Sequence, residues 1–77
     1  DHVYIVMFDY PDVGGMMDSA EIQYIDRTKA IEAAVRESKR PYNENVSLKH
    51  EWWNNECGRK ECERIDWEKE AKDEQTV

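Results

Sequence analysis

The sequence is poor in the residues that build specialised small scaffolds. Its 77 residues include only two cysteines, three glycines, two prolines and one phenylalanine. These low counts exclude a disulfide-rich scaffold, collagen and low-complexity repeats. No apolar run approaches the 18 residues of a membrane-spanning helix. The N-terminus also lacks the basic region followed by an apolar stretch that is typical of a secretory signal. We therefore expect one small domain at residues 1–70, followed by a frayed acidic tail at residues 71–77.

Recognisable catalytic motifs are lacking as well. The chain contains no glycine-rich phosphate-binding loop, no HExxH motif and no GxSxG motif. Cys57 and Cys62 stand in a C-x4-C spacing among acidic neighbours, and reduced thiols are the expected state. The alternatives are a disulfide across a tight turn, or a metal site that includes His50. We expect no enzymatic activity, no cofactor and no metal.

What is present is a clear pattern of strands. Residues 3–10, VYIVMFDY, are β-branched and aromatic, and both faces of this expected strand are apolar. Residues 11–18 have the composition of a loop, and residues 20–25 alternate as a half-buried strand does. Residues 46–53 alternate in the same way and predict a third strand. Residues 61–69 favour a hairpin partner for it, with a helix as the alternative.

One helix is expected at residues 27–40. Asp26 or Thr28 can cap its N-terminus, and Pro41 stops it. The expected buried stripe has a period of 3.6 residues and consists of Ala30, Ile31, Ala34 and Val35. The fold class is then α+β, a small antiparallel sheet with one helix packed on one face. Its order is ββαββ, or ββαβ plus a C-terminal helix, and the other sheet face should expose aromatic side chains.

Charge is distributed unevenly. The formal net charge is −7, and residues 1–26 hold six acidic residues and no lysine or arginine. Glu61 and Glu63 alternate along the fourth expected strand, and Asp66, Glu68 and Glu70 form a second alternating set. Side chains on one face of a strand are about 6.6 Å apart, which is on the order of the spacing of phosphates along a DNA strand. Such an array is consistent with a surface that imitates a nucleic-acid backbone, and the alternative is that these charges serve only solubility.

The expected element order, the opening strand VYIVMFDY and the acidic composition together resemble small phage-encoded accessory proteins. These include host-takeover factors and anti-CRISPR proteins, some of which mimic DNA. The resemblance implies a non-catalytic inhibitor in the cytoplasm of an infected bacterial host. Its partner would be a basic nucleic-acid-binding host protein, with no direct contact to nucleic acid or membrane.

Acidic residues of the strands and loops, with aromatic anchors beside them, are the expected partner-binding residues. They are Asp9, Tyr10, Asp12, Asp18, Glu21, Trp52, Trp53, Glu61, Glu63, Asp66 and Glu68. The alternative function is a small structural or adaptor domain that forms a homodimer and binds a partner protein through an exposed aromatic sheet face.

Overall fold

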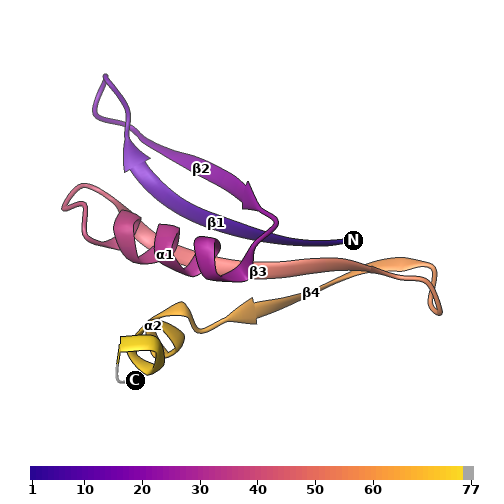
Figure 1. Ribbon diagram of the computed structural model, residues 1–77. Helices are drawn as coiled ribbons and strands as arrows, with labels where there is room; N and C mark the ends of the chain where they lie inside the picture. Colours follow the sequence, from indigo (N-terminus) through magenta and orange to yellow (C-terminus); the bar gives the residue numbers. More distant parts are fainter. Residues whose placement is uncertain (76–77) are drawn as a thin grey trace.

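The computed structural model describes residues 1–75 and shows a four-stranded antiparallel sheet with two helices (Figure 1). The elements in chain order are β1 (His2–Pro11), β2 (Met17–Tyr24), α1 (Arg27–Ser38), β3 (Glu44–Asn54), β4 (Arg59–Ile65) and α2 (Trp67–Gln75). The predicted α+β class and the ββαββ order are confirmed. A short C-terminal helix follows, so both of the sequence alternatives for the end of the chain are present.

The strand order across the sheet is β2-β1-β3-β4, which makes β1 and β3 the two central strands. β1 pairs antiparallel with β2 on one side and with β3 on the other, and α1 connects β2 to β3. The β1–β2 and β3–β4 hairpins turn at opposite ends of the sheet (Figure 1). The molecule measures 45 × 36 × 15 Å, so it is thin in one direction.

The hydrophobic core joins α1 to the two central strands. Ala30, Ile31 and Ala34 of α1 are buried in one cluster with Val6 of β1 and Leu48 of β3. The alanines have no bulk beyond Cβ, which lets the helix backbone lie near the sheet. Burial of this cluster provides the main favourable term in folding.

The predicted helix stripe needs one correction. Val35 is only half-buried, whereas Ala33 and Glu37 are buried. Glu37 tolerates burial because Arg40 lies 3.1 Å from its carboxylate and Asn43 donates to it at 3.1 Å. The stripe is therefore rotated slightly toward Ala33. Of the two predicted N-caps, Asp26 is the one used, since its side chain accepts a hydrogen bond from the backbone N–H of Lys29.

The predicted loop at residues 11–18 is too long. β1 continues to Pro11 and β2 begins at Met17, with these two residues paired, so the connection contains only residues 12–16. The Asp12 side chain closes this connection, because its Oδ1 accepts from the backbone N–H groups of Gly14 (2.8 Å) and Met16 (3.0 Å). Gly15 adopts a positive φ of 82°, which glycine allows without strain.

The predicted strand over residues 61–69 is correct only as far as Ile65. Asp66 then caps α2 by accepting a hydrogen bond from the backbone N–H of Lys69 at 3.2 Å. Glu68 and Glu70 consequently lie in the first turn of α2, and the expected strand alternation of Asp66, Glu68 and Glu70 is wrong. α2 continues to Gln75, so it includes most of the segment predicted as a tail. Residues 76–77 of that tail lie outside the described residues.

The sheet has two distinct faces. Opposite residues of antiparallel strands share a face, so the core residues Val6, Leu48 and Ile65 define an α1-side face. The opposite face, here called the open face, carries Val3, Ile5, Met7, Glu21, Gln23, Lys49, Glu51, Trp53, Lys60, Cys62 and Arg64. The expectation of an aromatic open face is correct only for Trp53. Tyr4, Phe8, Tyr24 and Trp52 point to the α1 side, and Trp53 is the one strand aromatic on the open face among the described residues.

No helix within residues 1–75 is both long enough and apolar enough to cross a membrane.

Candidate functional site

The eleven residues proposed from the sequence do not form one surface. Asp9, Tyr10, Asp12 and Asp18 come together where the β1–β2 hairpin turns, and we call this group the acidic hairpin end. The remaining residues are divided between the open face, the far end of the β3–β4 hairpin, and the start of α2. The turning points of the two hairpins lie at opposite ends of the sheet (Figure 1).

The acidic hairpin end is a well-ordered structure. Asp18 lies directly opposite Tyr10 in the β1–β2 register, and the Tyr10 hydroxyl donates to the Asp18 carboxylate at 3.5 Å. Asp12 holds the connecting loop through its two backbone hydrogen bonds. These carboxylates are therefore fixed in position, which reduces the entropy that they would lose on binding a partner.

Asp9 is held by neighbours from two strands. Its carboxylate accepts from the Ser19 hydroxyl at 2.8 Å and from the Asn45 side-chain amide at 2.8 Å. These hydrogen bonds, that of Asn45 first, favour the charged form and lower the pKa of Asp9 below its usual value. Asn45 reaches Asp9 because the register of β1 and β3 shifts after Met7, and Asn45 itself has a left-handed φ of 56°.

The charge of Asp9 should respond to the loss of its main donor. In an Asn45→Gly variant the glycine accepts the left-handed backbone, but the amide donor is gone. We expect the pKa of Asp9 to rise toward its ordinary value, as measured by carboxyl-carbon NMR titration. Ser19→Ala should give a smaller rise, because Ser19 is the second of the two causes. An unchanged Asp9 titration in both variants would contradict these hydrogen bonds.

The acids of the hairpin end have no cationic partner, as is also true of several other acids among the described residues. Within the described part of the chain, no lysine or arginine comes within 4 Å of the carboxylates of Asp9, Asp12 or Asp18. By contrast, Glu51 is paired with Lys49 at 3.2 Å, and further acids are paired elsewhere. Negative charge is therefore left uncompensated at this end of the sheet.

The tip of the same hairpin exposes apolar side chains. Val13 and Met16 lie in the connecting loop and Met17 begins β2, and all three are exposed, Met16 to 73 %. Exposed apolar groups surrounded by charge are typical of surfaces that contact another protein. The acidic hairpin end thus combines fixed carboxylates with an apolar tip. Sequence analysis identified the acids but assigned no role to the three apolar residues.

The far end of the β3–β4 hairpin carries a second group of predicted residues. Trp52 lies opposite Glu61 and His50 lies opposite Glu63, all on the α1-side face. Glu61 and Glu63 do alternate along one strand, as predicted. Both have partners, however, since Arg59 lies 3.3 Å from Glu61 and His50 lies 3.1 Å from Glu63. Trp53 points to the opposite face and is 53 % exposed.

Sequence analysis missed a stack of rings beside this group. His50 stacks on Tyr4, on His2 and against Trp52, with ring centroids 4.6, 4.9 and 4.7 Å apart. His2 Nδ1 lies 2.7 Å from His50 Nε2, and His50 Nδ1 lies 3.1 Å from Glu63. The rings are drawn together by the register of β1 with β3, which pairs His2 with Trp52 and Tyr4 with His50. Alternation in each strand was visible in the sequence, but this register was not.

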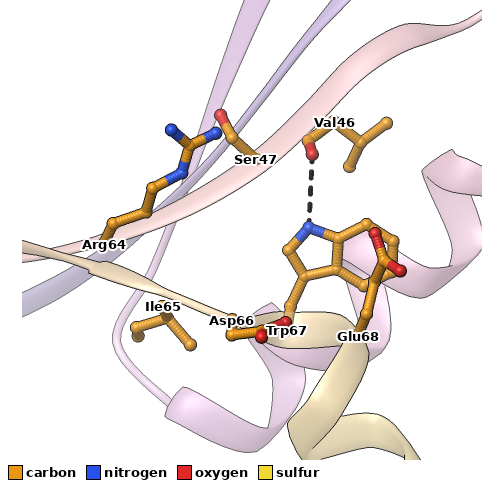
Figure 2. Close-up of a pocket in the computed structure, with 7 residues that line it drawn as sticks. All are labelled: Val46, Ser47, Arg64, Ile65, Asp66, Trp67 and Glu68. Atoms are coloured by element: carbon orange, nitrogen blue, oxygen red, sulfur yellow. Dashed lines mark hydrogen bonds between the residues drawn. The ribbon is translucent and has the colours of Figure 1, made fainter.

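Asp66 and Glu68 line a separate recess of about 410 Å³ between the end of β4 and the start of β3 (Figure 2). Trp67 forms part of its wall, and the indole N–H donates to the backbone carbonyl of Val46 at 3.2 Å. Arg64 extends along the opposite side toward Ser47. The recess therefore mixes both signs of charge, and its two acids do not extend the acidic hairpin end.

Glu21 and the cysteines lie elsewhere. Glu21 is on the open face, opposite Met7, and its charge helps to raise the pKa of Lys49, although Glu51 is the main cause. Cys57 and Cys62 are exposed free thiols. Among the side chains of residues 1–72, no three His, Cys, Asp or Glu converge in a way that could hold a metal ion.

Comparison with protein-family models, with curated proteins and with solved structures finds no match.

Proposed function

We propose that the protein is a non-catalytic binding protein that uses the acidic hairpin end to occupy a basic, nucleic-acid-binding site on a partner protein. One observation carries this proposal. Asp9, Asp12 and Asp18 are fixed on one hairpin turn, and none has a cationic partner within the described residues. Uncompensated carboxylates attract lysine and arginine side chains, which line sites that bind phosphates.

The exposed apolar tip supports the same assignment. A site made only of surface charge gives fast association but modest affinity, because water and salt screen each contact. Val13, Met16 and Met17 supply apolar area that is removed from water when a partner closes over the tip. The carboxylates would then speed the association of the two proteins, and the apolar tip of the hairpin would slow the dissociation of the complex.

The position of the hairpin end also suits this role. In this proposal α1 packs on the sheet over β1 and β3. The β1–β2 turn then projects beyond the helix, where a groove can receive it (Figure 1). We further propose that the protein belongs with the phage accessory proteins that it resembles. On this view it acts as an inhibitor in a bacterial cytoplasm.

The sharpest test neutralises the three acids without changing their shape. Asp12 holds the loop through oxygen acceptors, so a charge reversal there would disturb the fold, whereas Asp12→Asn keeps an acceptor. The triple variant Asp9→Asn, Asp12→Asn, Asp18→Asn changes the formal net charge from −7 to −4, because it removes three carboxylates. A control with Glu32→Gln, Glu56→Gln and Glu68→Gln makes the same change at exposed positions elsewhere.

The measurement is affinity capture from a bacterial lysate with wild type, hairpin variant and control. We expect wild type and control to retain a common basic protein that duplex DNA releases, and the hairpin variant to lose it. The association rate of the purified pair should fall steeply with salt. Equal retention by the hairpin variant, or retention that DNA does not affect, would exclude the proposed function.

A further inference from the structure

The open face of the sheet separates its charges from one side to the other. Its three cations, Lys49, Lys60 and Arg64, all lie on β3 and β4, and its acid on the other side is Glu21 on β2. Between them runs an apolar strip on β1, formed by Val3, Ile5 and Met7. The face thus has a basic half, an apolar strip beside its centre and an acidic edge.

Two charges on this face form no ion pair with the side chains that the structure describes, which are those of residues 1–72. The carboxylate of Glu51 forms ion pairs with the amino groups of Lys49 and Lys60, at 3.2 and 3.7 Å. Arg64 forms no ion pair within residues 1–72, and neither does Glu21, whose charge acts on Lys49 only at longer range. β2 and β4 are separated by β1 and β3. Three strand spacings amount to about 14 Å, so Glu21 and Arg64 cannot pair within one copy.

We propose that a second copy of this chain covers the open face, with Glu21 of each copy facing Arg64 of the other. Most homo-oligomers are two-fold symmetric, and the same patch then meets itself. Sheets that pack face to face keep their strands nearly aligned. This leaves two arrangements, one with the two-fold axis along the strands and one with the axis across them.

The charge pattern selects between the two arrangements. An axis across the strands stacks β4 on β4 and β2 on β2, so Arg64 lies over a strand whose charges on this face are only cationic, and Glu21 lies over a strand whose only charge on this face is acidic. An axis along the strands places β2 of each copy over the β3–β4 half of the other, which brings opposite charges together twice. Like charges held in contact across an interface are costly, so the second arrangement is favoured.

The remaining geometry fits this arrangement. Within one sheet, Met7 is paired with Glu21 on the neighbouring strand. Ile5 is paired with Lys49, which is in turn paired with Arg64. Glu21 and Arg64 are thus offset by two residues, about 6.6 Å, and two long side chains can bridge this offset. β1 of each copy then lies over β3 of the other, and the two apolar strips flank the axis. Ile5 is already only 3 % exposed in one copy, so the second copy would cover chiefly Val3 and Met7, which are half-buried.

A charge swap tests the contact directly by sedimentation velocity on the full chain, from 1 to 200 µM. We expect wild type to form a species of twice 9.2 kDa. Arg64→Glu and Glu21→Arg should each weaken the dimer at least tenfold, because each places like charges face to face. The double variant should return to within about threefold of wild type. Within one copy the two residues are too far apart to pair, so only a contact between copies explains such a rescue.

Matched controls are available on α1. Lys29→Glu and Glu32→Arg make the same charge changes on exposed positions away from the open face, and both should leave the dimer unchanged. The hairpin variant with Asp9, Asp12 and Asp18 neutralised should also still dimerise, which separates this inference from the proposed function. A monomeric wild type, single variants that still dimerise, or a double variant that is not rescued would each overturn the inference.

Discussion

Replacing Leu48 by alanine is expected to lower the free energy of unfolding by about 3–4 kcal/mol, the usual loss for a fully buried leucine. Leu48 is 0 % exposed and lies at the centre of the core cluster, on a central strand. It pairs with Val6 on one side and with Ile65 on the other, so rigid strands surround it and limit collapse into the cavity. A domain of this size has a total stability of roughly 4–12 kcal/mol, so this one change removes a large share.

The matched comparison is Ile22→Ala. Ile22 also pairs with Val6 and points to the α1-side face, but it lies on the edge strand β2 and is 36 % exposed. We expect a loss of about 1 kcal/mol, because the side chain buries less area. Chemical denaturation would measure both variants, and thermal unfolding of Leu48→Ala should shift down by about 12 °C or more. Equal losses at the two positions would show that the core is not centred on β1 and β3.

Replacing Trp67 by alanine is expected to release α2 from the rest of the domain. The Trp67 ring packs against the core cluster, and its indole N–H satisfies the Val46 carbonyl at a point where β3 has no β4 partner. The helix of nine residues is too short to persist without such an anchor. We expect a loss of about 2–3 kcal/mol, since the side chain is only half-buried.

The conservative variant separates the two contributions of Trp67. Trp67→Phe keeps most of the apolar contact but leaves the Val46 carbonyl without its donor, which should cost about 1 kcal/mol. Hydrogen exchange of the α2 amides is the direct measurement. In Trp67→Ala these amides should exchange far faster than those of β1 and β3, while in Trp67→Phe they should stay protected. Protected α2 amides in Trp67→Ala would mean that Ala71 and the Arg27–Glu70 ion pair suffice to hold the helix.

Local sequence patterns predicted most of the elements, because the periodicity of apolar residues is a local property. The alternation around Val6 and Leu48 indicated strands, and Ile31 marked the buried side of the helix. The exception was Asp66. An aspartate before a tryptophan is compatible both with a continuing strand and with the N-cap of a helix. The helix forms here because Trp67 packs against the core cluster while Asp66 caps α2.

The candidate site was less predictable because it depends on register. The sequence indicated that Asp9, Asp12 and Asp18 are acidic, and the hairpin brings them together as adjacent segments of one turn. It could not show that Asn45, distant along the chain, would hold Asp9. Nor could it show that Glu61 and Trp53 lie at the other end of the sheet, because strand order and shear are tertiary properties.

The exposed methionines of the hairpin tip make it chemically vulnerable. Met16 and Met17 are 73 % and 52 % exposed, whereas Met7 is partly covered on β1. Oxidants convert an exposed thioether to a sulfoxide, which is polar and no longer favours contact with apolar surfaces. Since neither side chain belongs to the core cluster, oxidation would leave the fold intact and change only the character of the tip. Methionine sulfoxide reductases reverse this reaction, so the state of the tip would follow the redox conditions around the protein.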